Sequence, residues 1–345
     1  MGFKVFFACV FLMAFCSCKK VDSPLSSKVS SLKKGLLVLN EGLFNLNNAS
    51  LSWIDLQTNA VETDFFVRKT GRFLGDTGND LGTYGSKIYI VVNVSSTIEV
   101  LDALTGNSIK QISMLVDGKS KQPRNMVFYE GKVFISCFDG YVDVLDTSSL
   151  LIEKRIKVGS NPDNLTIVND EIWIANSGGL KFPMYDSTIS IIHPKSFKVV
   201  KELVVGKNPG GISQIGSHVI VHTRGDYGEC KPQLHRIEPI SRVIEKSQLT
   251  DVSYLQGVGD TLLCFSSNRI SVLSIKTLTL EKTSFISLNE VISFYGIQYL
   301  PMSKSYLVFD ANGYTNLGYV YTYSETGQKI RKYNVGLNPS RAIEF

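Results

Sequence analysis

Short runs of apolar and β-branched residues recur along the whole chain, each bounded by polar turn residues. Runs of about 4–8 such residues between turn residues are typical of β-strands. Seven of the runs resemble one another, and their starts lie 39 to 52 residues apart. They begin at Leu36, Ile88, Val133, Ile172, Val219, Leu262 and Tyr306. A regular spacing of this size indicates an internal structural repeat.

The segments between these runs follow one order. Each run leads to a second strand such as STIEVLDALTG, then to a more polar one such as KVVKELVVG, and then to a turn and strand such as NPGGISQI. Four short strands in about 40 to 45 residues are the signature of a β-propeller blade. The sequence therefore predicts an all-β fold, a seven-bladed β-propeller with four-stranded blades. Two stacked β-sandwiches, the alternative, would not explain the period.

The two ends of the chain fit a closed ring. The chain enters the repeat with the second strand of a blade at Leu36 and stops after a first strand, Ala342 to Phe345. We therefore expect the C-terminal strand to pair into the first blade and close the ring.

The N-terminal segment has a different pattern. Lys4 precedes an apolar run from Val5 to Phe15, which is shorter than the roughly 20 residues that span a bilayer and fits a secretory signal. The small Ser17 just before Cys18 predicts processing as a bacterial lipoprotein, with Cys18 lipidated; cleavage at Cys16 and an ordinary cleaved signal are the alternatives. The predicted organisation is a signal peptide (1–17), a lipidated flexible tether (18–34) rich in Ser and Lys, and a propeller (35–345).

Composition and motifs narrow the function. The formal net charge is +5, 43% of the residues are hydrophobic, and the basic residues are scattered. This distribution disfavours a nucleic-acid partner, whose binding face is usually a basic cluster. Three cysteines fall within the predicted propeller without CxxC spacing, so neither a disulfide framework nor a structural zinc site is expected. The sequence contains no HExxH or GxSxG motif, and we expect no catalytic residues, metal or cofactor.

The longest connections are predicted to share one face. In a propeller the loops between second and third strands lie on the same side as the blade-to-blade turns, and residues 40–50, 176–187, 223–232 and 311–318 form four such long loops. Their aromatic, amide and Arg side chains suit a large, flat, polar ligand, although Asn also caps its own turns. The candidate ligand-binding residues are Phe44, Asn45, Asn47, Asn48, Arg72, Asn93, Arg124, Phe182, Tyr185, Arg224, Tyr227, Tyr254, Tyr295, Tyr314 and Arg341.

Two stretches also carry a family resemblance. VLNEGLFNLNNASLSWIDLQTN (38–59) and RFLGDTGNDLGTYGSKIYIVVNVSSTIEVLDALTG (72–106) are similar to the YncE-like propeller lipoproteins of Bacteroidetes, which include BtuG-type surface proteins that capture cobalamin. These motifs mark the broader family rather than its cobalamin-binding branch. The resemblance covers essentially all of the mature chain. It implies a propeller anchored in the outer membrane by its lipid, which hands cobalamin, a related corrinoid or another small organic nutrient to a TonB-dependent transporter.

One departure concerns the membrane side. Surface export in these bacteria favours acidic residues just after the lipidated Cys, and here Lys19 and Lys20 follow it. Display on the cell surface is the expectation, and a periplasm-facing lipoprotein is the alternative.

The residues alone leave other functions open. A metal-dependent lactonase-type hydrolase would hold Ca²⁺ or Mg²⁺ with oxygen ligands from several blades. The residues that end successive second strands fit that chemistry: Glu41, Asn93, Asp139, Asn176 and Asp310. A protein-interaction scaffold or a capturer of another ligand, such as a siderophore, are further alternatives. Our interpretation is a propeller that binds a ligand on its loop-rich face and is not an enzyme.

Overall fold

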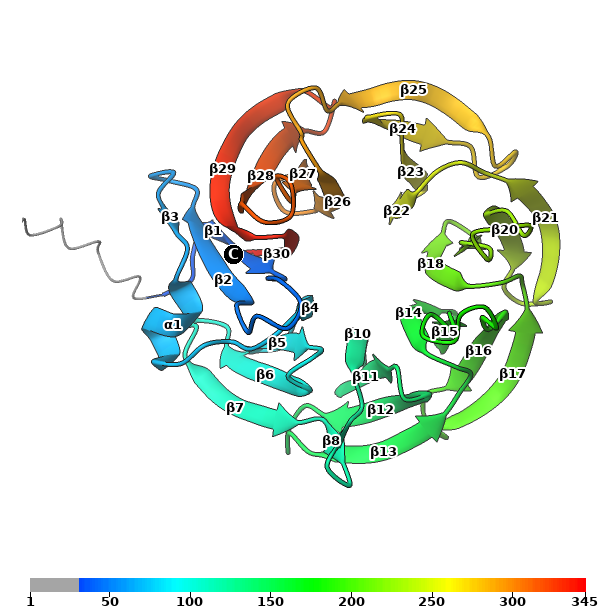
Figure 1. Cartoon of the computed structure of the whole chain (residues 1–345), viewed down its shortest axis with the longest axis horizontal. Coiled ribbons are helices and arrows are strands. Elements are labelled where there is room, and N and C mark those ends of the chain that lie inside the picture. The colour runs from blue at the N-terminus through cyan, green and yellow to red at the C-terminus, as the bar shows by residue number, and fades with distance from the viewer. Residues whose placement is uncertain (1–30) are drawn as a thin grey trace, which may run out of the picture. The chain divides into compact units, whose positions relative to one another are not determined.

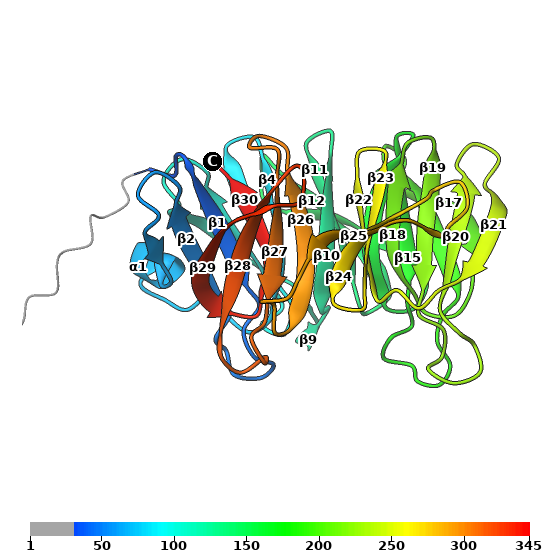
Figure 2. The same cartoon turned by 90° about the horizontal axis from the view of Figure 1, so that it is seen from above.

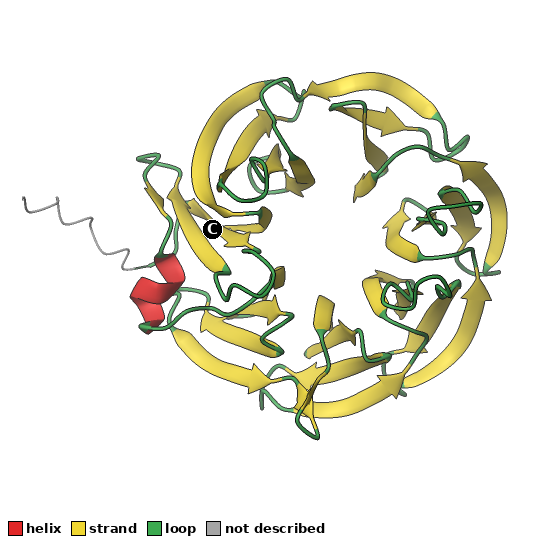
Figure 3. Ribbon diagram, viewed as in Figure 1, coloured by secondary structure: helices red, strands yellow, loops and turns green. Residues whose placement is uncertain are grey.

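Seven antiparallel sheets of four strands each stand around a central channel (Figures 1 and 3). This arrangement comes from a computed structural model that describes residues 31–345. It confirms the predicted seven-bladed β-propeller. The predicted signal peptide and Cys18 lie outside the described residues. Leu32, which falls in the predicted tether, is buried and donates its N–H to the carbonyl of Leu104 at 2.7 Å.

The blades are numbered here in ring order, and their strands are given from the channel outward. Blade 1 contains β30 (Pro339–Glu344), β1 (Gly35–Asn40), β2 (Ser50–Asp55) and β3 (Val61–Glu62); blade 2 contains β4 (Gly78–Tyr84), β5 (Lys87–Val92), β6 (Thr97–Asp102) and β7 (Ser108–Ser113). Blade 3 contains β10 (Pro123–Tyr129), β11 (Lys132–Cys137), β12 (Tyr141–Asp146) and β13 (Ile152–Lys157); blade 4 contains β14 (Pro162–Val168), β15 (Glu171–Asn176), β16 (Thr188–His193) and β17 (Lys198–Val204). Blade 5 contains β18 (Pro209–Ile215), β19 (His218–Thr223), β20 (Gln233–Glu238) and β21 (Val243–Leu249). Blade 6 contains β22 (Tyr254–Val258), β23 (Thr261–Ser266), β24 (Arg269–Leu273) and β25 (Leu280–Ser287); blade 7 contains β26 (Phe294–Leu300), β27 (Ser305–Asp310), β28 (Leu317–Ser324) and β29 (Lys329–Leu337).

The ring closes as predicted. β30 pairs antiparallel with β1, placing Ala342 opposite Val38, and the backbones of Gly35 and Phe345 exchange hydrogen bonds of 2.9 and 3.0 Å. The Phe345 ring lies 6.0 Å from that of Trp53. The last strand therefore completes the first blade.

The second strand of each blade is the most apolar because it is covered on both faces. Every residue of β1 is buried, as is nearly all of β5 and β11. Apolar clusters join neighbouring blades: Tyr89 and Val100 of blade 2 share one with Met126 and Ile135 of blade 3. Burial on both faces explains why these strands read as continuous apolar runs rather than as alternating ones.

Two small elements interrupt the repeat, and the repeat pattern in the sequence does not predict them. The helix α1 (Phe65–Thr70) follows β3, buries Phe65 and Phe66, and ends at Gly71 in the left-handed region. A hairpin of β8 (Leu115–Val116) and β9 (Lys119–Ser120) lies between blades 2 and 3. No helix within residues 31–345 is long and apolar enough to cross a membrane.

The beginning of each inner strand has a special geometry. In four blades an Asn or Gln with positive φ precedes a proline; these are Gln122, Asn161, Asn208 and Asn338. The pairing register shifts next to this turn, and it also shifts at the start of β4 and β26. A bulge of this kind takes residues out of the ladder and redirects their side chains. On the inner strands the residues left unpaired are Asn79, Arg124, Asn125, Asp163, Asn164, Gly210, Tyr295 and Ser340.

The four predicted long loops all project on one face, in two pairs (Figure 2). Residues 41–49 and 311–316 form one pair, and residues 177–187 and 224–232 form the other. Each pair belongs to neighbouring blades, blades 1 and 7 or blades 4 and 5, so the pairs flank the channel from different sides.

Candidate functional site

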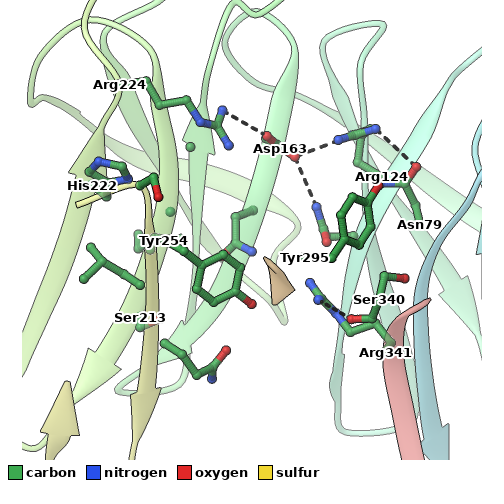
Figure 4. Close-up of a pocket in the computed structure, with 18 of the residues that line it drawn as sticks. Asn79, Arg124, Asp163, Ser213, His222, Arg224, Tyr254, Tyr295, Ser340 and Arg341 are labelled. Carbon is green, nitrogen blue, oxygen red and sulfur yellow. Dashed lines mark hydrogen bonds and ion pairs between the residues drawn. The ribbon is translucent and has the colours of Figure 1, made fainter. Parts of the chain in front are cut away.

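A cavity of about 440 Å³ opens at the end of the channel that faces the long loops (Figure 4). All seven inner strands, or the residues just before them, contribute to its wall. Every inner-strand residue that the bulges leave unpaired lines this cavity, which we call the mouth. The bulges are thus the local device that builds the site.

One carboxylate organises two arginines in the mouth. The Nε of Arg124 lies 3.5 Å from Oδ1 of Asp163, and Nη1 of Arg224 lies 3.6 Å from its Oδ2. Asn125 donates a hydrogen bond of 3.2 Å to the same carboxylate. Figure 4 shows Asp163 between the two guanidinium groups. Because blades 3, 4 and 5 each contribute one of these charges, the blade packing fixes the spacing.

Gly210 lets Arg224 lie flat against the start of β18. A Cβ at position 210 would stand 2.2 Å from Cζ and 2.3 Å from Nη1 of Arg224. Any larger residue there must push the guanidinium away. The glycine therefore serves the position of Arg224, because position 210 does not have a positive φ.

The other charged residues of the mouth, Arg341 and Glu41, each have a protein partner. Arg341 Nε lies 3.4 Å from Oδ1 of Asp80, and burial raises the pKa of the Asp80 carboxyl. Tyr295 donates a short hydrogen bond to Glu41. Burial raises the pKa of the Glu41 carboxyl, and this hydrogen bond partly offsets the rise. Both carboxylates thus already have protein donors.

Three residues that line the mouth each carry a buried polar atom with no hydrogen-bond partner within residues 31–345, although one of these atoms lies in the 3.5 Å ion pair with Asp163. The atoms are Nε of Arg124, Nε2 of His222 and Oγ of Ser340. His222 is 8% exposed, and burial, with the nearby charge of Arg224, lowers its pKa to about 4, so the ring is neutral at pH 7. An unpaired buried polar group typically costs about 1–3 kcal/mol, which makes these atoms candidates for ligand contact.

A second cavity of about 460 Å³ adjoins the mouth beneath loop 224–232. The two share His222, Arg224 and Ser253. Pro232 and Val252 contribute apolar surface to the second cavity. We call it the side chamber. A polar compartment and a more apolar one thus meet at His222 and Arg224.

Of the predicted ligand-binding residues, five lie together in the mouth. They are Arg124, Arg224, Tyr254, Tyr295 and Arg341. A sixth, Tyr227, lines the side chamber. The fold brings these six residues together because each lies at the start of an inner strand or in the connection that follows β19.

The predicted aromatic residues on the loop tips form two exposed lips. Tyr185 contacts both Phe182 and Tyr227 edge-on, with ring centroids 6.0 and 6.1 Å apart. On the other side, Tyr314 meets Tyr295 edge-on at 6.1 Å, and Phe44 is 72% exposed. The lip residues Phe182, Tyr185, Phe44 and Tyr314 do not line the mouth, whereas Tyr295 does.

The predicted Asn residues of loop 41–49 do not line the mouth. Asn48 accepts the N–H of Leu43 at 2.7 Å, and it lines a separate cavity of about 220 Å³ rather than the mouth. Asn45 and Asn47 have positive φ, and their backbone N–H groups donate to Asp76 at 3.2 and 3.1 Å. Asn is favoured at such positions because it tolerates the left-handed region.

Two further predicted residues lie away from the mouth. Asn93 donates a 2.8 Å hydrogen bond to the carbonyl of Pro123 and so joins blades 2 and 3. Arg72 pairs at 2.6 Å with buried Glu99, which belongs to the third strand of blade 2. Its guanidinium lies over the ring of Phe66 in α1. The connection between blades 1 and 2 is lengthened by α1, which explains why Arg72 is not at the channel.

The set considered for a lactonase-type metal site is dispersed. Only Glu41 of the five lines the mouth. Asp139 pairs with Arg155, Asn176 donates to Ser190 at 2.9 Å, and Asp310 accepts backbone N–H groups of its own blade. Within residues 31–345 no group of three or more His, Cys, Asp and Glu side chains is placed to hold a metal ion.

Several mouth residues were not predicted as site residues. They are Asn79, Asn125, Asn164, Gly210, His222, Gln256 and Ser340. For most of the blades a signal existed in the sequence, because the two residues that follow each Asn-Pro or Gln-Pro turn all line the mouth.

Comparison with known proteins places the chain in a family. The profile of the family described as "Domain of unknown function (DUF5074)" matches residues 34–257. The chain belongs to the DUF5074 family. No curated protein matches the sequence of this DUF5074 protein.

Solved structures similar to the DUF5074 propeller share its fold at low identity. A quinonprotein alcohol dehydrogenase-like protein from Bacteroides thetaiotaomicron is 13% identical with a TM-score of 0.64, over 91% of this chain and 79% of that one. Hydrazine synthase of Kuenenia stuttgartiensis is 14% identical with a TM-score of 0.61, over 74% and 85%. BamB from Moraxella catarrhalis is 13% identical with a TM-score of 0.52, over 84% and 83%. These likenesses concern the fold alone.

Proposed function

We propose that this DUF5074 propeller captures a small organic nutrient at the mouth and carries out no chemistry on it. The observation that carries the proposal is the concentration of Arg124, Arg224 and Arg341 around one cavity, together with buried polar atoms that have no hydrogen-bond partner within residues 31–345. Donors held in place by the blades suit a ligand rich in carbonyl, carboxylate or phosphate oxygen. The aromatic lips add surface for an apolar or planar part.

The resemblance to YncE-like lipoproteins supplies the rest of the proposal. Cys18 anchors the mature protein in the outer membrane, the propeller faces the cell exterior, and the ligand passes to a TonB-dependent transporter. Cobalamin or a related corrinoid is the ligand to test first, since its amide side chains and phosphate offer acceptors to the mouth.

The decisive experiment is calorimetric titration of the fragment 19–345 with cyanocobalamin. Saturable binding that weakens in Arg224→Gln is the expected result, because this residue lies in both the mouth and the side chamber. A matched control is Lys201→Gln, which removes an exposed positive charge from the outer strand β17 and should bind as wild type does. Absence of binding would exclude corrinoids as the ligand. An equal loss of affinity in Arg224→Gln and Lys201→Gln would show that the mouth is not the binding site.

The anchor is tested separately in cells. Cys18→Ser should abolish incorporation of labelled palmitate and release the protein from the membrane fraction. Cleavage of the wild-type protein by protease added to intact cells is expected for display on the surface, whereas protection would place the propeller on the periplasmic side.

A further inference from the structure

The mouth and the side chamber differ in chemistry although they share a wall. The mouth is lined by three Arg residues and by Asn, Gln and Tyr side chains. The side chamber contributes Pro232, Val252 and the ring of Tyr227. Each has a volume within the range of about 300–1,000 Å³ that is typical of ligand pockets. A single ligand that occupies both would need one polar end and one apolar end.

The charges at the junction favour an anion for the polar end. Arg124 and Arg224 share the single carboxylate of Asp163 at 3.5 and 3.6 Å. Charge-assisted Arg–carboxylate hydrogen bonds usually measure about 2.7–2.9 Å, so both guanidiniums keep donors for another acceptor.

The other carboxylates near these arginines already accept hydrogen bonds from the protein. Glu41 accepts the hydroxyl of Tyr295 and interacts electrostatically with Arg124 and Arg341. Asp80, which does not line the mouth, accepts the backbone N–H of Met126 at 2.9 Å besides pairing with Arg341. Where mouth and chamber meet, the carboxylate in direct contact with Arg124 and Arg224 is that of Asp163, and the side chamber adds one charge of each sign, Lys231 and Asp251. The positive charges at this junction therefore outnumber the negative ones.

His222 marks the same junction independently. The side chain is more than nine-tenths buried, it lines both cavities, and its Nε2 has no hydrogen-bond partner within residues 31–345. A neutral imidazole nitrogen can donate to an oxygen acceptor when it carries the proton. It therefore adds a directional contact without adding charge.

We propose that the site takes an amphipathic organic anion. A carboxylate or phosphate group lies between Arg124 and Arg224 in the mouth, and an aromatic or alicyclic body extends past His222 into the side chamber. This inference rests on the proposed binding function and specifies its ligand class. Tyr227 covers the body from the loop side, where Tyr185 supports its ring.

The first test uses 2-naphthoate and its neutral isostere 2-naphthamide as probes, titrated into the fragment 19–345. We expect naphthoate to bind about tenfold more tightly, which corresponds to about 1.4 kcal/mol, because a hydrogen bond to a charged group is stronger than one to a neutral amide. Equal affinity of the two probes would overturn the anionic end. 2-Naphthyl phosphate binding more tightly than naphthoate would assign a phosphate head, and the reverse a carboxylate head.

Gly210→Ala provides a variant that keeps every charge. The added Cβ would meet the guanidinium of Arg224, the far end of a flexible side chain, so the arginine can move aside while the blade keeps its fold. Naphthoate affinity should fall by about tenfold and naphthamide affinity should not change. Gly179→Ala is the matched control, since its nearest contact, Oγ of Ser177, is 3.3 Å away in a loop outside the mouth. Unchanged naphthoate binding in Gly210→Ala would overturn the role of Arg224.

The apolar end is tested with benzoate and Tyr227→Ala. Naphthoate should bind more tightly than benzoate, and Tyr227→Ala should reduce that difference; equal affinities would overturn the side chamber. These outcomes are distinct from those of the cyanocobalamin titration. Failure of cyanocobalamin with selective naphthoate binding removes the corrinoid proposal alone, whereas cyanocobalamin binding with no charge selectivity among the probes overturns the anion inference alone.

Discussion

The buried histidine of the mouth makes a measurable prediction about pH. Burial, with smaller contributions from Arg224 and His235, lowers the pKa of His222 from 6.5 to about 4. The unfolded chain therefore binds more protons than the folded chain between these two values. Stability from this group is complete above pH 6.5 and is lost as the pH falls toward 4. We expect His222→Asn to remove this part of the pH dependence.

The magnitude follows from the two pKa values. One pKa unit corresponds to about 1.4 kcal/mol, so His222 should account for a fall of about 2.5 kcal/mol in the free energy of unfolding between about pH 7.5 and about pH 4.5. Other groups also titrate in this range. Burial lowers the pKa of His235 in the same direction, and it raises that of Asp80 and so opposes the loss. These groups are common to both proteins, so the difference between the curves isolates His222.

The assay is urea-induced unfolding followed by tryptophan fluorescence at a series of pH values. As the pH falls from about 6.5 to about 4, the free energy of unfolding should fall more steeply for wild type than for His222→Asn. Below that range the two curves should run parallel. Substitution alone shifts a curve by a fixed amount, so the comparison uses slopes and not absolute values. Parallel curves for wild type and variant over the whole pH series would refute the assignment of a neutral, buried imidazole.

Two further predictions concern the scaffold. Asp143 accepts hydrogen bonds of 2.7 Å from Lys121 and 2.8 Å from Arg155 inside blade 3, and Asp143→Asn should lower the free energy of unfolding by about 3–5 kcal/mol because it leaves the buried Lys121 without its counter-charge. Glu130→Gln, in an exposed pair, should leave the urea midpoint unchanged, and an equal effect of both variants would contradict this reasoning. Ala342→Asp places a charge in the buried seam between β30 and β1, so thermal unfolding should become broad and begin at lower temperature; a sharp transition at the wild-type temperature would show that the closing strand is dispensable.

The sequence contained most of the fold because each blade repeats the same burial problem. A second strand covered on both faces must be apolar throughout, so Leu36, Ile88 and their equivalents mark the blades directly. The closing strand was also predictable, since the chain enters the repeat one strand late. The helix α1 and the β8–β9 hairpin had no such signal, because they occur once each and bury few residues.

The site was predicted only in part for a geometric reason. Residue type and loop length pointed to Arg124, Arg224 and Arg341, and the structure brings them together. The same criteria selected Phe44 and Asn48, which do not line the mouth. The side chain of Phe44 is exposed, and the amide of Asn48 accepts a hydrogen bond within its own loop. Which residues turn toward the channel depends on the bulges, and a bulge is a property of strand pairing that a single strand does not display.

The bulges also separate recognition from architecture. Residues such as Arg124, Asp163 and Gly210 stand outside the hydrogen-bond ladder and outside the apolar clusters between the blades. Replacing them removes neither strand pairing nor core. Related chains can therefore diverge in what they bind while they keep the same ring. The same property makes the propeller a starting point for selection experiments, in which a library varied at one or two positions per blade would search new ligands on an unchanged framework.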